Sequence, residues 1–133
     1  MRKLTLAVVP DMIKHNWGRI VSITGKSEPP RGLYGASAPK AAVHGFSKGL
    51  SNEIGKFGIT VNCVAPGKIM SEQIRRKHDE RERKVFAEEE IPVGRYGEPE
   101  ELARVAVFLA SPYSGFITGT VIPVDGGLRR YAF

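Results

Sequence analysis

The sequence predicts an α/β protein built on a parallel sheet, and three observations support this prediction. Two short runs rich in β-branched residues, 18–24 and 59–65, flank a segment with helical periodicity over 39–57. A strand, a long helix and a second strand in this order form a right-handed crossover, which makes the two strands parallel. A third strand-like run, 120–127, follows further helical segments, so the expected sheet has three strands.

The strand runs also indicate where each strand lies in the sheet. The run 59–65 is apolar apart from Thr60 and Asn62, as expected for a strand that is covered on both faces. Pro66 and Gly67 follow this run and stop it. Pro123 cannot donate to a ladder of hydrogen bonds, so the run 120–127 is expected at an edge of the sheet.

The remaining helices are indicated by apolar spacing and by their first residues. Residues 4–14 have an apolar stretch with helical spacing, and 71–90 predict one charged helix. An apolar helix is expected over 98–110, because Pro99 stands near its first position.

The helix over 39–57 has two distinct faces. Large apolar residues at helical spacing are expected to cover the sheet, and they are Val43, Phe46, Leu50, Ile54 and Phe57. Each glycine inside a helix costs about 1 kcal/mol relative to alanine, so a line of small residues needs a reason. The small residues predict a close contact with another helix, and they are Ala38, Ala42, Gly45 and Gly49.

Length and charge exclude several classes of protein. The 133 residues suit one domain, and no apolar run of 18 residues or signal-peptide pattern occurs, so we expect a protein of the cytoplasm. The formal net charge is +6, but the densest charged segment, 71–90, holds six basic and seven acidic residues. Without a basic stripe, nucleic acid is not an expected partner.

Cysteine and histidine usage gives no sign of a metal site. Cys63 is the one cysteine, so an internal disulfide and a cysteine cluster for zinc are excluded. It is expected in a buried strand as a small hydrophobic residue. His15, His44 and His78 are scattered along the chain, and no metal ligand set is expected.

The segment 24–27, Thr-Gly-Lys-Ser, ends like a phosphate-binding P-loop. That motif needs a glycine five residues before Gly25, and Ile20 stands there, inside the first strand run. The P-loop interpretation is therefore rejected.

Three segments in order resemble the C-terminal half of the short-chain dehydrogenases/reductases. They are GRIVSIT (18–24), PKAAVHGFSKGLSNEIGKFGITVNCVAPG (39–67) and GRYGEPEELARVAVFLASPYSGFITGTVIPVDGG (94–127). The resemblance covers nearly the whole chain. It implies a doubly wound, Rossmann-type fold, hydride transfer between NAD or NADP and an alcohol or carbonyl substrate, and assembly into dimers or tetramers.

The expected fold is a partial doubly wound (Rossmann-like) parallel sheet with flanking helices, in which residues 1–133 form a single domain. The N-terminal half of the family's fold, which is absent, carries a glycine-rich turn that seats the cofactor's pyrophosphate at a helix N-terminus. No strand–Gly-x-x-x-Gly-x-Gly–helix unit occurs in this sequence. We therefore expect weak binding of NAD or NADP, and one exposed edge on strand 18–24.

The resemblance implies a catalytic serine, tyrosine and lysine, of which one is retained. Lys40 matches the lysine, which would hold the nicotinamide ribose and lower the pKa of the tyrosine. The tyrosine position, four residues earlier, is Ala36, and the serine position is Gly25. Two of the three catalytic positions are therefore substituted.

Neighbouring side chains are candidates to replace the two lost groups. Tyr34 stands six residues before Lys40, on the wrong face of a continuous helix. Pro39 disfavours helical geometry at the residue before it, so the helix is expected to begin at Pro39 and to leave Tyr34 on a loop. Thr24 or Ser27 could supply the hydroxyl. The alternatives are that Tyr34 is a surface loop residue and Lys40 a solvated lysine.

The resemblance also implies contacts to the cofactor. Pro66 and Gly67 match the turn that approaches the nicotinamide, and the backbone of Ile69 would meet its carboxamide. Ser71 stands where the family often has a threonine on the cofactor, although an ordinary helix N-cap is an equal alternative.

Three functions remain open from the sequence. The first is an NAD(P)-dependent oxidoreductase of this family, and the second is an inactive remnant that acts as an oligomerising scaffold. The third is one half of a split enzyme. The segment 71–90 is too polar to indicate a substrate class.

Overall fold

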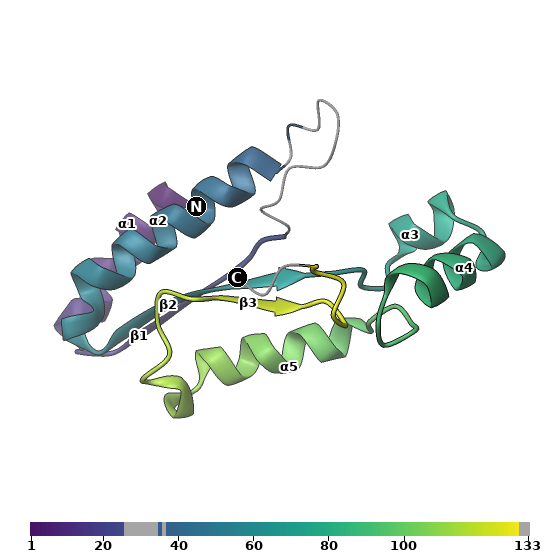
Figure 1. Ribbon diagram of the computed structural model, residues 1–133. Coiled ribbons are helices and arrows are strands. Elements are labelled where there is room, and N and C mark those ends of the chain that lie inside the picture. The colour runs from purple at the N-terminus through teal and green to yellow at the C-terminus, as the bar shows by residue number, and fades with distance from the viewer. Residues whose placement is uncertain (26–34, 36, 131–133) are drawn as a thin grey trace.

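The structure is a computed structural model that describes residues 1–25, 35 and 37–130. Helices separate the strands along the chain, as Figure 1 shows. In order, the elements are α1 (Arg2–Lys14), β1 (Gly18–Ile23), α2 (Ser37–Ile54), a 3-10 turn (Gly55–Phe57), β2 (Ile59–Pro66), α3 (Glu72–Lys77), α4 (Glu80–Glu90), α5 (Pro99–Ala110), a second 3-10 turn (Pro112–Ser114) and β3 (Val121–Val124).

Within the described residues, the strands form one parallel sheet in the order β1-β2-β3. Gly18 pairs with Ile59 at the start of β1, and Cys63 pairs with Val121 at the start of β3. The residues of β2 are buried from Ile59 to Ala65, as its apolar sequence predicts. The predicted parallel sheet is therefore confirmed, with β1 and β3 at its edges and Pro123 on an edge strand.

Helices cover both faces of the sheet. Figure 1 shows α1 and α2 on one face and α5 on the other, with α3 and α4 beyond the ends of the strands. The contacts agree, because α2 packs mainly on β2 while α5 packs on β1 and β2. This arrangement places the carboxyl end of β1 beside the first half of α2, where Thr24 contacts His44.

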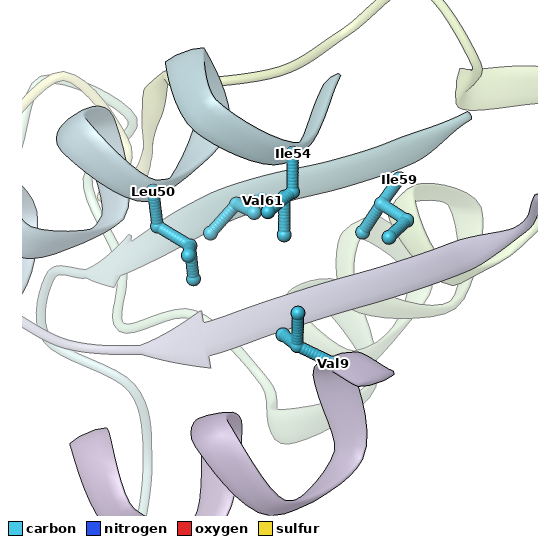
Figure 2. Close-up of a cluster of buried hydrophobic side chains, with 5 residues drawn as sticks. All are labelled: Val9, Leu50, Ile54, Ile59 and Val61. Carbon is cyan, nitrogen blue, oxygen red and sulfur yellow. The ribbon is translucent and has the colours of Figure 1, made fainter. Parts of the chain in front are cut away.

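The apolar face of α2 packs into the core as predicted. Leu50 and Ile54 form one cluster with Val9 of α1 and with Ile59 and Val61 of β2 (Figure 2). Full burial of such a side chain stabilises the fold by about 1.5–3 kcal/mol. The second half of α2 is thus anchored by the hydrophobic effect.

The small residues of α2 face open space instead. A Cβ built on Gly45 or Gly49 meets no atom within 4 Å. Ala38 and Ala42 are exposed. In the described part of the chain no helix packs on this line, so the predicted helix contact remains a prediction about a second chain.

The charged segment 71–90 is two helices, and the prediction of one helix is wrong. The break falls at His78 and Asp79, where both residues have extended backbone. Asp79 caps the second helix, since its Oδ1 accepts from the amide of Glu82 at 2.8 Å and its own amide donates to Glu82 Oε2 at 3.2 Å. This reciprocal capping box satisfies two amides that a helix start leaves unpaired.

The start of α2 also differs from expectation. The helix begins at Ser37 and not at Pro39. Proline is tolerated in a first turn, because the amide that it lacks has no partner inside the helix there. Ala38 therefore adopts helical geometry despite the proline that follows it.

Cys63 lies where the sequence places it, in a buried strand. Its Sγ donates to Oγ of Ser47 at 3.3 Å. Burial raises the pKa of the Cys63 thiol, and the Ser47 hydrogen bond opposes this shift. The residue acts as a small core side chain and not as a reactive thiol.

Candidate active site

Lys40 lies against the carboxyl end of β1. A Cβ built on Gly25 would lie 2.9 Å from Cδ and 3.1 Å from Cε of Lys40, and nearer still to Nζ. The side chain of Lys40 therefore occupies the space into which any larger residue at position 25 would project. Lys40 and Gly25 are thus neighbours in space, although they are 15 residues apart in the sequence.

Thr24 is held at the same end of β1. Its amide donates to the carbonyl oxygen of Val64 at 2.8 Å, and its hydroxyl donates to the same oxygen at 3.3 Å. Oγ1 also lies 2.7 Å from Nε2 of His44. The hydroxyl that was a candidate to replace the serine is buried and engaged with His44 and the backbone.

His44 is a site residue that the sequence did not indicate. It stands one helical turn after Lys40 on α2. Burial lowers the pKa of His44 from its ordinary value of 6.5, and the positive charge of Arg129 lowers it further. The imidazole is therefore neutral at neutral pH. The spacing of four residues from Lys40 is the signal that could have drawn attention to it.

Gly67 lies where two segments of backbone meet. Its amide donates to the carbonyl oxygen of Val124 at 2.9 Å. A Cβ built on Gly67 would lie 2.5 Å from the Cα of Asp125. Position 67 therefore needs a glycine, because the segment after β3 comes too close to it for a side chain. This reason holds whether or not a ligand also approaches the position. Pro66 is the last residue of β2.

Asp125 holds the turn that follows β3. Its Oδ1 accepts from the amide of Gly127 at 2.9 Å, and its Oδ2 accepts from the amide of Arg129 at 3.1 Å. Aspartate commonly stabilises turns in this way. The turn brings the charge of Arg129 close enough to His44 to lower the pKa of the imidazole.

Ile69 presents a peptide donor and acceptor beyond the end of β2. It forms an isolated parallel bridge with Gly97. In this bridge the amide of Met70 donates to the Gly97 carbonyl (2.8 Å), and the amide of Gly97 donates to the Lys68 carbonyl (2.9 Å). In a parallel bridge the central residue's own N–H and C=O point to the opposite side. Those groups of Ile69 therefore face away from Gly97.

Arg95 and Glu101 fix the loop that carries Gly97. Arg95 donates to both carboxylate oxygens of Glu101, at 2.8 and 2.7 Å, and the amide of Glu98 donates to Oε2 at 2.8 Å. The Arg95 hydrogen bond is the main cause that lowers the pKa of Glu101 to about 2. The carboxylate is therefore ionised at neutral pH. Its bidentate pair with Arg95 holds the loop in which Gly97 bridges to Ile69.

Ser71 is the N-cap of α3, as one of its two interpretations proposed. Its Oγ accepts from the amide of Ile74 at 3.3 Å. This geometry does not test a contact to a cofactor, because a hydroxyl that accepts from a helix amide still has its hydrogen to donate.

The other candidates fall outside the described part of the chain. Tyr34 and Ser27 lie there, as does Ala36 at the tyrosine position. Among the residues that the structure describes, no group of three or more His, Cys, Asp or Glu is arranged to hold a metal ion. No helix in the described ranges is long and apolar enough to span a membrane.

Comparison with known proteins gives consistent matches. A family model described as "Enoyl-(Acyl carrier protein) reductase" matches residues 2–129. The 3-oxoacyl-[acyl-carrier-protein] reductase FabG of Chlamydia trachomatis is 41% identical over 126 residues, covering 92% of this chain and 49% of that protein. The acetoacetyl-CoA reductase of Shinella zoogloeoides is 43% identical over 129 residues, covering 93% of this chain and 52% of that protein.

Solved structures agree with the sequence comparison. A gluconate 5-dehydrogenase from Burkholderia cenocepacia, in complex with NADP and tartrate, has a TM-score of 0.83 and 35% identity, over 93% of this chain and 49% of that chain. This chain belongs to the short-chain dehydrogenase/reductase family. It spans about half the length of the relatives that it matches.

Proposed function

We propose that this chain provides the nicotinamide end of the active site of an NAD(P)-dependent oxidoreductase, which transfers hydride between its cofactor and an alcohol or carbonyl substrate. The observation that supports this most is the place of Lys40 against the carboxyl end of β1. In open parallel sheets, ligands bind beyond the carboxyl ends of the strands. The names of the relatives, which include an acetoacetyl-CoA reductase, agree with this class of reaction.

The residues at this edge fit one end of a nicotinamide cofactor. The ammonium of Lys40 offers donors for ribose hydroxyls. The N–H and C=O of Ile69, which face away from Gly97, match the acceptor and donor of a carboxamide. The hydroxyl of Ser71 offers a further donor while it caps α3. A bound nicotinamide supplies or accepts the hydride.

Proton transfer is the weaker part of this site. Position 36 holds alanine, and the Thr24 hydroxyl is engaged with Val64 and His44. A general acid must come within about 2.6–3.2 Å of the reacting oxygen, directly or through one water. Tyr34 is our candidate for this role if any activity survives, and we expect little or no turnover of the native sequence.

A second candidate function is that of a partner subunit, either a scaffold or one half of a split enzyme. It is favoured by β1, which pairs only with β2 in the described sheet. An unpaired strand edge is a template for another chain. Hydrogen exchange of the β1 amides, measured with and without the N-terminal half of a FabG reductase, tests this candidate. Slower exchange in the presence of that half would support a partner subunit, whereas unchanged exchange would support a self-contained site.

Reduced nicotinamide mononucleotide tests the main proposal, because it lacks the adenylate half of the cofactor. We expect binding in the range of about 1–10 mM, observed by NMR titration. Lys40→Ala should remove it, while Lys48→Ala, on the same helix two turns away, should leave it unchanged. Equal binding by Lys40→Ala, or no binding to the unmodified chain, would contradict the proposal.

A further inference from the structure

We propose that His44 is a positioning residue for Lys40. In this arrangement the imidazole ties the first half of α2 to the end of β1 through Thr24, and so keeps the lysine ammonium over Gly25. The inference about α2 stands on the structure alone, whereas its importance for cofactor binding rests on the proposed function.

Thr24 is held firmly by the sheet. Its amide and its hydroxyl both donate to the Val64 carbonyl in the middle of the sheet, at 2.8 and 3.3 Å. Oγ1 of Thr24 also forms a hydrogen bond with Nε2 of His44, at 2.7 Å. This hydrogen bond ties the imidazole to the sheet.

The contacts of Lys40 and His44 are in register with the end of β1. Lys40 and His44 are four residues apart on α2, so their side chains lie one above the other on one face. Gly25 and Thr24 are consecutive residues at the end of β1. Lys40 meets the first of these and His44 meets the second. One helical turn of α2 is thus matched to one step along the strand.

The first half of α2 has little apolar support. Its buried residues all lie in its second half, from Ser47 to Ile54. Residues 38–42, which include Lys40, are exposed. Helix ends without core contacts open easily, and a single hydrogen bond then controls a large share of the local stability. The His44–Thr24 hydrogen bond is a side-chain link from this half of the helix to the sheet.

The charges around His44 are compatible with this role. Lys40 stands one turn before it on α2, and Arg129 acts on it from the segment after β3. Burial and the charge of Arg129 both favour the neutral imidazole. A neutral His44 accordingly adds no positive charge beside the ammonium of Lys40.

The test uses the 133-residue chain and two variants at position 44. His44→Gln keeps an N–H near the place of Nε2, and His44→Leu removes it. We expect His44→Leu to speed hydrogen exchange of amides 41–45 by about 3- to 10-fold, the range that one hydrogen bond controls. It should also shift the Lys40 side-chain NMR signals, while amides near Ile54 stay unchanged. His44→Gln should restore both.

Thr24→Val is the second arm, because it removes the hydroxyl and keeps the shape. It should reproduce the effect of His44→Leu, and the double variant should add nothing further. His15→Leu, at the exposed histidine that caps the C-terminus of α1, is the matched control. Unchanged Lys40 signals in His44→Leu, or a His44→Gln variant that behaves like His44→Leu, would overturn the inference.

The outcome separates this inference from the proposed function. If His44→Leu moves the Lys40 signals but the unmodified chain binds no nicotinamide mononucleotide, the proposed function fails and the positioning role stands. If the mononucleotide binds equally to both proteins and Lys40 does not move, the positioning role fails and the proposed function stands.

Discussion

At the scale of single residues, the candidate site combines one retained group with two substituted positions. Lys40 occupies space beside Gly25 that a serine side chain would claim. The conflict is with the flexible end of a lysine, so a serine could be accommodated if the ammonium moved. Positions 25 and 40 are therefore coupled, because a serine restored at position 25 would displace the ammonium of Lys40.

Activity should depend on a tyrosine at position 34 or 36. In a form of the protein that turns over, Tyr34→Phe should lower the rate about 100-fold or more, as expected for a lost proton-transfer group. Ala36→Tyr should raise it, because it restores the family's spacing to Lys40. NADPH oxidation with acetoacetyl-CoA is the measurement. Unchanged turnover in Tyr34→Phe would remove this residue from the mechanism.

The pKa of His44 predicts a pH dependence of stability. Because its folded-state pKa lies below the ordinary 6.5, the unfolded chain binds more protons as the pH falls through that value. Stability should be fully present above 6.5 and should decline as the pH falls toward the folded-state pKa. Urea unfolding between about pH 7.5 and about pH 5 measures it. His44→Gln should remove this part of the decline, and an identical decline in that variant would refute the assignment.

At the scale of elements, α2 has an anchored half and an exposed half. Leu50 and Ile54 hold its second half in the core. Its small residues face open space, and on α1 Leu4 and Leu6 are 72% and 51% exposed. Apolar surface of this kind on two helices of the same face is typical of an interface between chains.

We therefore expect α2 to pack against a second copy of this chain. Gly45→Leu adds a large side chain where a close helix pair has no room, and it should shift the oligomer toward smaller species. Light scattering measures the mass. A compact monomer of 14.6 kDa for the unmodified chain would contradict this expectation.

The strands were predictable because their signals are local. β-Branched runs and Pro123 indicate strands and an edge without knowledge of the rest of the fold. The break between α3 and α4 also had a local signal, Asp79 followed three residues later by Glu82, but it was hidden in a uniformly charged segment. The Thr24–His44 pair could not be predicted, because it exists only once α2 crosses the end of β1.

At the scale of the whole molecule, our proposal assigns to this chain only the nicotinamide end of a cofactor site. The sheet has β1 at one edge, and the chain spans about half the length of the relatives that it matches. The residues that we propose for contacts with a cofactor, which include Lys40 and Ile69, would all serve its nicotinamide end. No glycine-rich pyrophosphate turn occurs in the sequence.

The affinity of this chain for NADPH tests that claim most directly. Isothermal titration into the 133-residue protein should give a dissociation constant weaker than about 1 mM, because no helix N-terminus with its glycine-rich turn is present to bind the pyrophosphate. NADPH should then bind no more than about tenfold more tightly than reduced nicotinamide mononucleotide, a difference of about 1.4 kcal/mol. Micromolar binding of NADPH to this chain alone would contradict the account.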